Sequence, residues 1–199
     1  MKIGDGWEAE DGKGEGERVG NKKIHEMKKH GDYIHSKGLK FGINTAPGAR
    51  TCGNLLGSYQ HELQDGKTSA DWGIDYLKYD WCSYSEIAPK PDLDGLKKPY
   101  QVMQASLGKA NRDIMYSLCQ YGWGNVWEWG AEVNGNSWRT TGDIQDTWQS
   151  MAIIGFNQGP AALHAQPGHF NDPDMLVVGK VGWGPSLHNT RLTFDEQYT

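Results

Sequence analysis

The chain has 199 residues, of which 37% are hydrophobic and 23% charged, and this composition is typical of a single globular domain. Its net charge of -5 argues against nucleic acid as the main partner. The sequence contains no run of 18 apolar residues and no apolar signal region at its start, so it predicts neither a membrane span nor a secretory peptide.

Six apolar, β-prone segments alternate with helical patterns along the chain. The expected strands are residues 1–7, 39–45, 74–81, 113–119, 137–141 and 169–175. The expected helices cover residues 22–37, 59–72, 99–109 and 143–156, and Asp143 could cap the last of them. A repeated strand and helix unit predicts an α/β fold with a parallel sheet.

Polar residues follow nearly every expected strand. They are Asp5, Asn44, Asp80, Gln120, Arg139 and Asp174. A doubly wound sheet gathers such residues at one switch point, whereas a (β/α)₈ barrel gathers them from all strands on one face. We therefore favour a barrel. A complete barrel takes about 250 residues, so this one is expected to be incomplete.

Asp80 is the candidate site residue that stands out most. It ends a buried, aromatic-rich strand pattern, where a carboxylate is costly unless it has a use. Asp143 lies just beyond another strand pattern, four residues after Arg139. Two carboxylates at strand ends, each near a cation, indicate glycoside hydrolysis. The alternatives are an ion pair between Asp80 and Lys78, which strand alternation puts on one face, and a helix cap for Asp143.

Other patterns indicate no metal and no cofactor. The seven His form no HExxH motif, and residues 92–95 resemble the start of a calcium loop but lack the later Glu, so we interpret them as a turn. The glycine-rich residues 12–20 lack the ending of a phosphate loop and predict a flexible surface loop. Nine Trp and nine Tyr suit sugar binding, although most of the Trp are expected in the core.

Five motifs together give the sequence a family resemblance. They are residues 33–43 (YIHSKGLKFGI), 76–82 (YLKYDWC), 116–119 (YSLC), 138–144 (WRTTGDI) and 171–176 (NDPDML). In this order and spacing they resemble the catalytic domain of glycoside hydrolase family 27, the α-galactosidase (melibiase) and α-N-acetylgalactosaminidase group, with the bacterial α-galactosidase branch most similar. The resemblance extends over essentially the whole chain.

The resemblance implies a (β/α)₈ barrel of which residues 1–199 form one partial catalytic domain. Against the family pattern the chain begins at the second barrel strand and ends just past the seventh. The first and last strands and the C-terminal β domain are then absent, and we expect these residues alone to be inactive. The implied reaction is a retaining double displacement that releases terminal α-D-galactosyl residues.

The resemblance also implies roles for individual residues. Asp80 matches the nucleophile and Asp143 the acid/base. The positions implied to contact the sugar are Asp5, Trp7, Lys78, Cys119, Tyr121, Arg139, Asp174 and Met175. A bulky Tyr121 near the sugar 2-position favours galactose over N-acetylgalactosamine. The cysteine count of three is odd, and spacing alone does not select a pair. The resemblance implies a disulfide between Cys52 and Cys82.

Two departures from the family pattern concern the glycone. Gly4 replaces the first of two consecutive carboxylates, and Asn44 replaces a Tyr. Both changes loosen the side of the pocket that would face C6 of galactose. The first alternative is therefore a β-L-arabinopyranosidase of the same family, because that sugar lacks C6. The second is a non-catalytic galactose-binding module.

The expected partner is a galactosyl oligosaccharide or polysaccharide, with no nucleic acid and no membrane. A disulfide favours a secreted or periplasmic protein. The sequence gives no indication of the oligomeric state.

Overall fold

The computed structural model describes residues 1–12, 16–174, 176 and 193, and its centre is a five-stranded parallel sheet. The strands are β1 (Gly42–Thr45), β2 (Tyr76–Asp80), β3 (Met115–Cys119), β4 (Ser137–Arg139) and β5 (Phe170–Asp172). They are hydrogen-bonded in the order of the chain, each to the next. A doubly wound sheet would reverse its order at a switch point, so this sequential order confirms the wall of a barrel.

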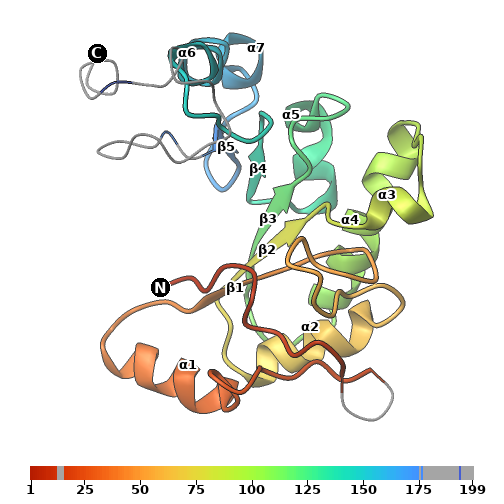
Figure 1. The fold of residues 1–199 in the computed structure, drawn as a ribbon, viewed down its shortest axis with the longest axis vertical. Helices are drawn as coiled ribbons and strands as arrows, with labels where there is room; N and C mark the ends of the chain where they lie inside the picture. Colours follow the sequence, from red (N-terminus) through yellow and green to blue (C-terminus); the bar gives the residue numbers. More distant parts are fainter. Residues whose placement is uncertain (13–15, 175, 177–192, 194–199) are drawn as a thin grey trace.

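Helices connect the strands and lie outside the sheet. They are α1 (Met27–Ser36), α2 (Glu62–Asp71), α3 (Tyr84–Ile87), α4 (Leu93–Leu107), α5 (Val126–Trp129), the 3₁₀ helix η1 (Gly130–Val133), α6 (Trp148–Phe156) and α7 (Gly159–Ala162). In Figure 1, α1, α2 and α4 follow one another around the lower side of the strands, while α6 and α7 lie at the opposite end. None of the helices in the described residues is long and apolar enough to cross a membrane.

The register of the sheet brings the C-terminal ends of its strands together. Asp80 at the end of β2 is paired with Cys119 at the end of β3. Arg139 at the end of β4 is paired with Asp172 at the end of β5. Polar residues predicted at separate strand ends therefore share one edge of the sheet.

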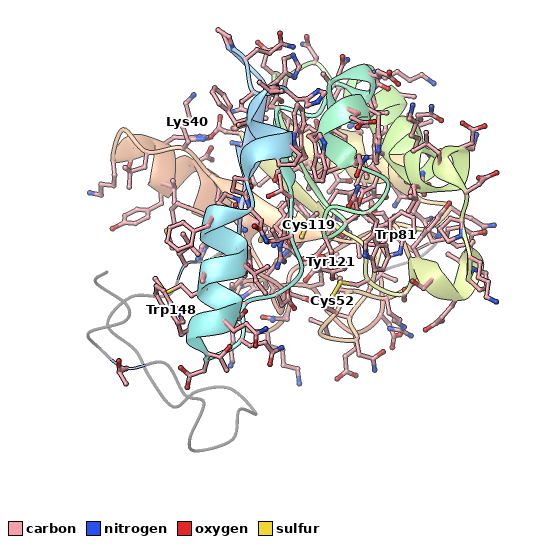
Figure 2. All side chains as sticks on the ribbon, turned by 90° about the horizontal axis from the view of Figure 1, so that it is seen from above. Lys40, Cys52, Trp81, Cys119, Tyr121 and Trp148 are labelled. Carbon is pink, nitrogen blue, oxygen red and sulfur yellow. A yellow bond between two sulfur atoms is a disulfide. The ribbon has the colours of Figure 1, made fainter. Side chains whose placement is uncertain are left out.

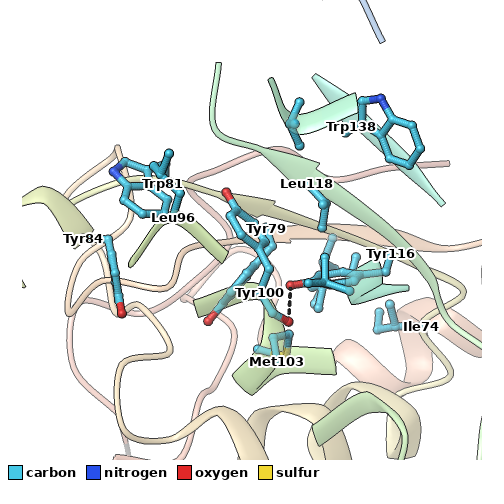
Figure 3. Close-up of a cluster of buried hydrophobic side chains, with 14 of the residues drawn as sticks. Ile74, Tyr79, Trp81, Tyr84, Leu96, Tyr100, Met103, Tyr116, Leu118 and Trp138 are labelled. Atoms are coloured by element: carbon cyan, nitrogen blue, oxygen red, sulfur yellow. Dashed lines mark hydrogen bonds between the residues drawn. The ribbon is translucent and has the colours of Figure 1, made fainter. Parts of the chain in front are cut away.

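An aromatic layer fills the space between β2, β3 and α4 (Figure 3). Tyr79, Tyr100 and Tyr116 are buried, and the Tyr116 hydroxyl donates to the Tyr100 carbonyl at 3.4 Å. In β2 every second residue faces this layer, because strand side chains alternate between faces. Lys78 and Asp80 consequently point to the opposite, inner face.

Asp75 fastens the other end of β2. Its carboxylate accepts hydrogen bonds from the Phe41 N–H at 2.8 Å and from Arg112 Nη2 at 2.6 Å, and it lies 2.8 Å from His35 Nε2. Burial alone would raise the pKa of Asp75, but these three partners lower it to about 2. The group therefore stays ionised and ties α1, β1 and the start of β3 to β2.

The segment at residues 1–7 is not the strand that the sequence predicted. It forms one parallel bridge, between Lys2 and Gly42, and the Ile3 N–H donates to the Gly42 carbonyl at 2.8 Å. Beyond this point Gly6 has φ +100°, in the left-handed region that ends an extended strand.

Two expected helix starts are wrong. Helix α4 begins at Leu93, before Pro99, because the Asp92 carboxylate caps it by accepting from the Gly95 N–H at 2.8 Å. Residues 92–95 are therefore a helix start and not a turn. Helix α6 is capped by the Thr147 hydroxyl, which leaves Asp143 outside the helix.

The described part of the glycine-rich loop is anchored, which corrects the prediction of a flexible surface segment. Arg18 is 1% exposed and pairs with Asp65 of α2 and with Ser58. Its guanidinium also lies 5.8 Å from the ring of Trp7. A buried guanidinium requires such partners, and they fix this loop on the barrel.

Candidate active site

Asp80 lies at the end of β2 with both carboxylate oxygens engaged. Lys78 Nζ is 3.4 Å from its Oδ2, and the Tyr121 hydroxyl donates to its Oδ1 at 3.1 Å. The Asp80 side chain keeps 14% of its surface exposed. The ion pair that was the structural alternative is thus present, and it leaves the carboxylate accessible from the inner face.

A disulfide joins Cys52 to Cys82 beside this carboxylate and confirms the pairing that the resemblance implied. Both sulfur atoms lie within 4.8 Å of an Asp80 carboxylate oxygen. Among the described residues, these three form the one group with the composition of a metal site. Because both sulfurs are committed to the disulfide, the group lacks the thiolate ligands that a metal requires. Cys119 is free and buried.

Arg139 organises a second group of charges at the end of β4. Its side chain is 5% exposed, and its Nη2 lies 2.6 Å from Asp143 Oδ1 and 2.6 Å from Asp174 Oδ2. The Asp143 side chain is 73% exposed, whereas that of Asp174 is 7% exposed. One buried cation therefore holds a carboxylate that reaches solvent and another that does not.

Cys119 and Lys78 lie between the two groups. Burial, assisted by the Asp80 charge, raises the pKa of Cys119 to about 12, so the thiol is neutral at ordinary pH. Arg139 Nη1 donates to its sulfur at 3.8 Å. Burial lowers the pKa of Lys78, but Cys119 and Asp80 outweigh this effect and leave it raised. Because the Cys119 thiol is neutral near pH 7, Asp80 is the negative charge that keeps the Lys78 pKa raised there.

Tyr121 connects the two groups. Its hydroxyl contacts Asp80, and its ring centroid is 5.2 Å from the Arg139 guanidinium carbon. Burial and the negative charge of Asp80 raise the pKa of the Tyr121 phenol, which keeps it protonated as a donor. Figure 2 shows Tyr121 between Cys119 and Cys52 near the centre of the molecule.

The two N-terminal candidates, Asp5 and Trp7, differ in their exposure to solvent. Asp5 is exposed and its carboxylate accepts from the Gly53 N–H at 2.5 Å, next to the disulfide. Trp7 has no exposed surface, and its indole donates to the Asn44 carbonyl at 2.8 Å. Trp7 therefore supports the end of β1, and its contact with the sugar stays a prediction. Met175 lies outside the described residues.

Two buried polar residues were not among the predicted site residues, although Gln120 was noted as one of the polar residues at strand ends. Gln120 is fully buried, and its side-chain amide exchanges two hydrogen bonds with the backbone of Trp123, at 2.8 and 2.9 Å. These bonds shape the turn that carries Tyr121. Glu8 is also buried, which raises its pKa to about 7 despite the opposing effect of Arg18. The sequence signal for Gln120 was its place after a strand; we find none for Glu8.

The arrangement provides the elements of acid/base and nucleophilic chemistry. A partly exposed carboxylate is held between a cation and a phenol, and an exposed carboxylate is held by a buried guanidinium. The two groups lie at the carboxyl ends of the parallel strands β2 and β4, with β3 between them, and barrel enzymes carry their sites at these strand ends.

Comparison with known proteins agrees with this architecture. The family model described as alpha galactosidase A matches residues 1–194. A curated Arabidopsis thaliana protein named Alpha-galactosidase 2 is 47% identical over 152 residues, which are 76% of this chain and 36% of that protein. Alpha-galactosidase A of Cellvibrio japonicus is 42% identical over 183 residues, covering 82% of this chain and 43% of its own. The chain thus spans less than half the length of these two relatives.

Solved structures give the same result. Alpha-galactosidase I from Mortierella vinacea superimposes with a TM-score of 0.79 at 29% identity, covering 89% of this chain and 50% of its own. The α-galactosidase of Saccharomyces cerevisiae superimposes with a TM-score of 0.82 at 26% identity, covering 88% of this chain and 43% of its own. The chain belongs to the α-galactosidase family, glycoside hydrolase family 27, and its sheet is part of that family's barrel.

Proposed function

We propose that the protein is a retaining glycosidase that releases terminal α-D-galactosyl residues, with Asp80 as nucleophile and Asp143 as acid/base. The observation that carries the proposal is the pair of held carboxylates on one edge of the sheet, Asp80 by Lys78 and Tyr121, and Asp143 by Arg139. The names of the relatives support the galactosyl substrate.

In the first step, Asp80 attacks the anomeric carbon while Asp143 gives a proton to the departing glycosidic oxygen. The product is a glycosyl ester on Asp80. The exposure of Asp143 suits this role, since a leaving group of variable size must approach it from solvent. The partial burial of Asp80 suits its own role, because a desolvated carboxylate is a stronger nucleophile.

In the second step, Asp143 takes a proton from water, which attacks the anomeric carbon and releases Asp80. Arg139 remains paired with Asp143 throughout and limits where that carboxylate can point. We assign Lys78, Arg139, Asp5 and Asp174 to the sugar hydroxyls. The S. cerevisiae enzyme has been solved with raffinose, and we propose galactosyl oligosaccharides or polysaccharides as substrates here.

The test is an activity panel on the full-length protein with aryl α-D-galactoside, aryl α-N-acetylgalactosaminide and aryl β-L-arabinopyranoside. We expect the galactoside to give the highest kcat/KM and Asp80→Asn to abolish turnover, because the amide cannot form the ester. Tyr33→Phe is the matched control, since Tyr33 is an exposed residue of α1. Full activity of Asp80→Asn would contradict the proposed mechanism.

A β-L-arabinopyranosidase is the second candidate, and one observation favours it. Gly4 stands where the family pattern has a carboxylate, and a Cβ there would meet nothing within 4 Å, so no neighbouring side chain takes the place of that carboxylate. A dominant rate on the arabinopyranoside would select this candidate. Binding of galactose with no turnover of any of the three substrates would instead indicate a sugar-binding module.

A further inference from the structure

Tyr121 contacts both Asp80 and Arg139, and the proposed mechanism gives it no role. It follows β3 by two residues and has φ +65°, in the left-handed region that non-glycine residues rarely adopt. Such strain persists where surrounding contacts enforce it, and it is concentrated at functional sites. Here the strained turn directs the Tyr121 ring back over the strand ends.

Four contacts define where this side chain lies. Its hydroxyl donates to Asp80 Oδ1 at 3.1 Å and is 4.0 Å from Cys52 Sγ of the disulfide. Its ring lies under the Arg139 guanidinium at 5.2 Å and packs edge-on against Trp123 with centroids 5.5 Å apart. The ring is thus fixed on several sides, and the hydroxyl has a defined direction.

The two oxygens of Asp80 have different partners as a result. Oδ2 faces the Lys78 ammonium at 3.4 Å, and Oδ1 accepts from the phenol. A hydrogen bond to a carboxylate is strongest while the carboxylate is charged. In the proposed reaction Asp80 loses its charge when the glycosyl ester forms and regains it when the ester is hydrolysed.

We propose that Tyr121 is a positioning residue that orients Asp80 and favours its departure from the glycosyl ester. This inference rests on the proposed function. In ester hydrolysis water attacks the anomeric carbon, its proton passes to Asp143, and the bond between that carbon and the Asp80 oxygen breaks with its electron pair going to Asp80. The Tyr121 hydroxyl donates to the carboxylate as that charge returns. It therefore assists the second step more than the first.

The Arg139 contact gives Tyr121 a second consequence. Because the same guanidinium holds Asp143 and lies over the Tyr121 ring, the ring helps to fix Arg139 and, through it, the acid/base group. A Phe ring keeps this packing and removes the hydrogen bond alone. Tyr121→Phe consequently separates the two effects.

The test measures Tyr121→Phe in the full-length protein with an activated aryl α-D-galactoside, for which ester hydrolysis limits kcat. We expect kcat to fall by about 10- to 100-fold, with a burst of released phenol, because a hydrogen bond to a charged group is lost in the second step. We expect kcat/KM, which reports the first step, to change by less than about threefold. The matched control is Tyr84→Phe, because the Tyr84 ring packs on Trp81 with centroids 4.9 Å apart. This variant should leave both kcat and kcat/KM unchanged.

A second measurement does not depend on turnover. In protein with ¹³C-labelled tyrosine rings, the Tyr121 Cζ resonance, assigned with Tyr121→Phe, should shift when Asp80 is replaced by Asn. Equal falls in kcat and kcat/KM, no change in either, or an unshifted resonance would each overturn the inference. A wild-type protein without galactosidase turnover would refute the proposed function instead, and the resonance would then decide whether Tyr121 positions Asp80.

Discussion

Removal of the disulfide should cost a large part of the stability of this domain. Cys52 and Cys82 are separated by 30 residues, with their Cα atoms 4.9 Å apart. In the chain-entropy relation, closing a loop of about 30 residues removes roughly 12 cal/mol/K from the unfolded chain, which is about 3.6 kcal/mol at 25 °C. The double variant Cys52→Ala with Cys82→Ala should therefore lose about 3–4 kcal/mol.

The assay is equilibrium unfolding in urea of the oxidised wild type and the double variant, with thermal melting as a second readout. For a domain of this size, the melting temperature should fall by about 7–14 °C. A reductant should lower the stability of the wild type toward that of the variant and leave the variant unchanged. A loss of less than about 1 kcal/mol in the free energy of unfolding would refute the reasoning, because the disulfide would then restrict the unfolded chain very little.

Two further predictions concern the scaffold. Asp75→Asn should cost roughly 2 kcal/mol at pH 7, because the pKa of Asp75 is lowered from 3.8 to about 2. That stability is present above pH 3.8 and is lost as the pH falls through 2, so urea titrations should show the wild type and variant converging in this window; a constant difference would contradict this. Gly130→Ala should cost about 1–3 kcal/mol, since its Cβ would lie 2.5 Å from the Trp138 ring. Gly155→Ala in α6, where the Cβ meets nothing within 4 Å, is the control, and equal melting temperatures for the two variants would refute the packing argument.

The parallel barrel wall and the charged strand ends could be predicted from the sequence, because both follow from local patterns. Alternation along β2 placed Lys78 and Asp80 on one face, and the structure confirms this with an ion pair at 3.4 Å. The disulfide required the resemblance, since three cysteines allow several pairings. The contact between Tyr121 and Asp80 had no sequence signal, because it depends on a strained turn after β3.

A local helix cap and a long-range ion pair explain two expectations that were wrong. The sequence predicts this helix over residues 99–109, whereas the Asp92 cap allows α4 to begin at Leu93. The buried Arg18 could not be distinguished from the charged residues around it, because its partner Asp65 is far away in the chain.

The central claim is that Asp80 forms a covalent bond to the sugar, and trapping that ester tests it most directly. The full-length protein would be incubated with a fluorinated galactosyl fluoride that forms the glycosyl-enzyme quickly and hydrolyses slowly, then digested and examined by mass spectrometry. The account predicts one added fluorogalactosyl group on the peptide that carries Asp80, with none on the Asp80→Asn variant. A label on a different residue, or turnover of the reagent with no labelled Asp80 peptide, would contradict it.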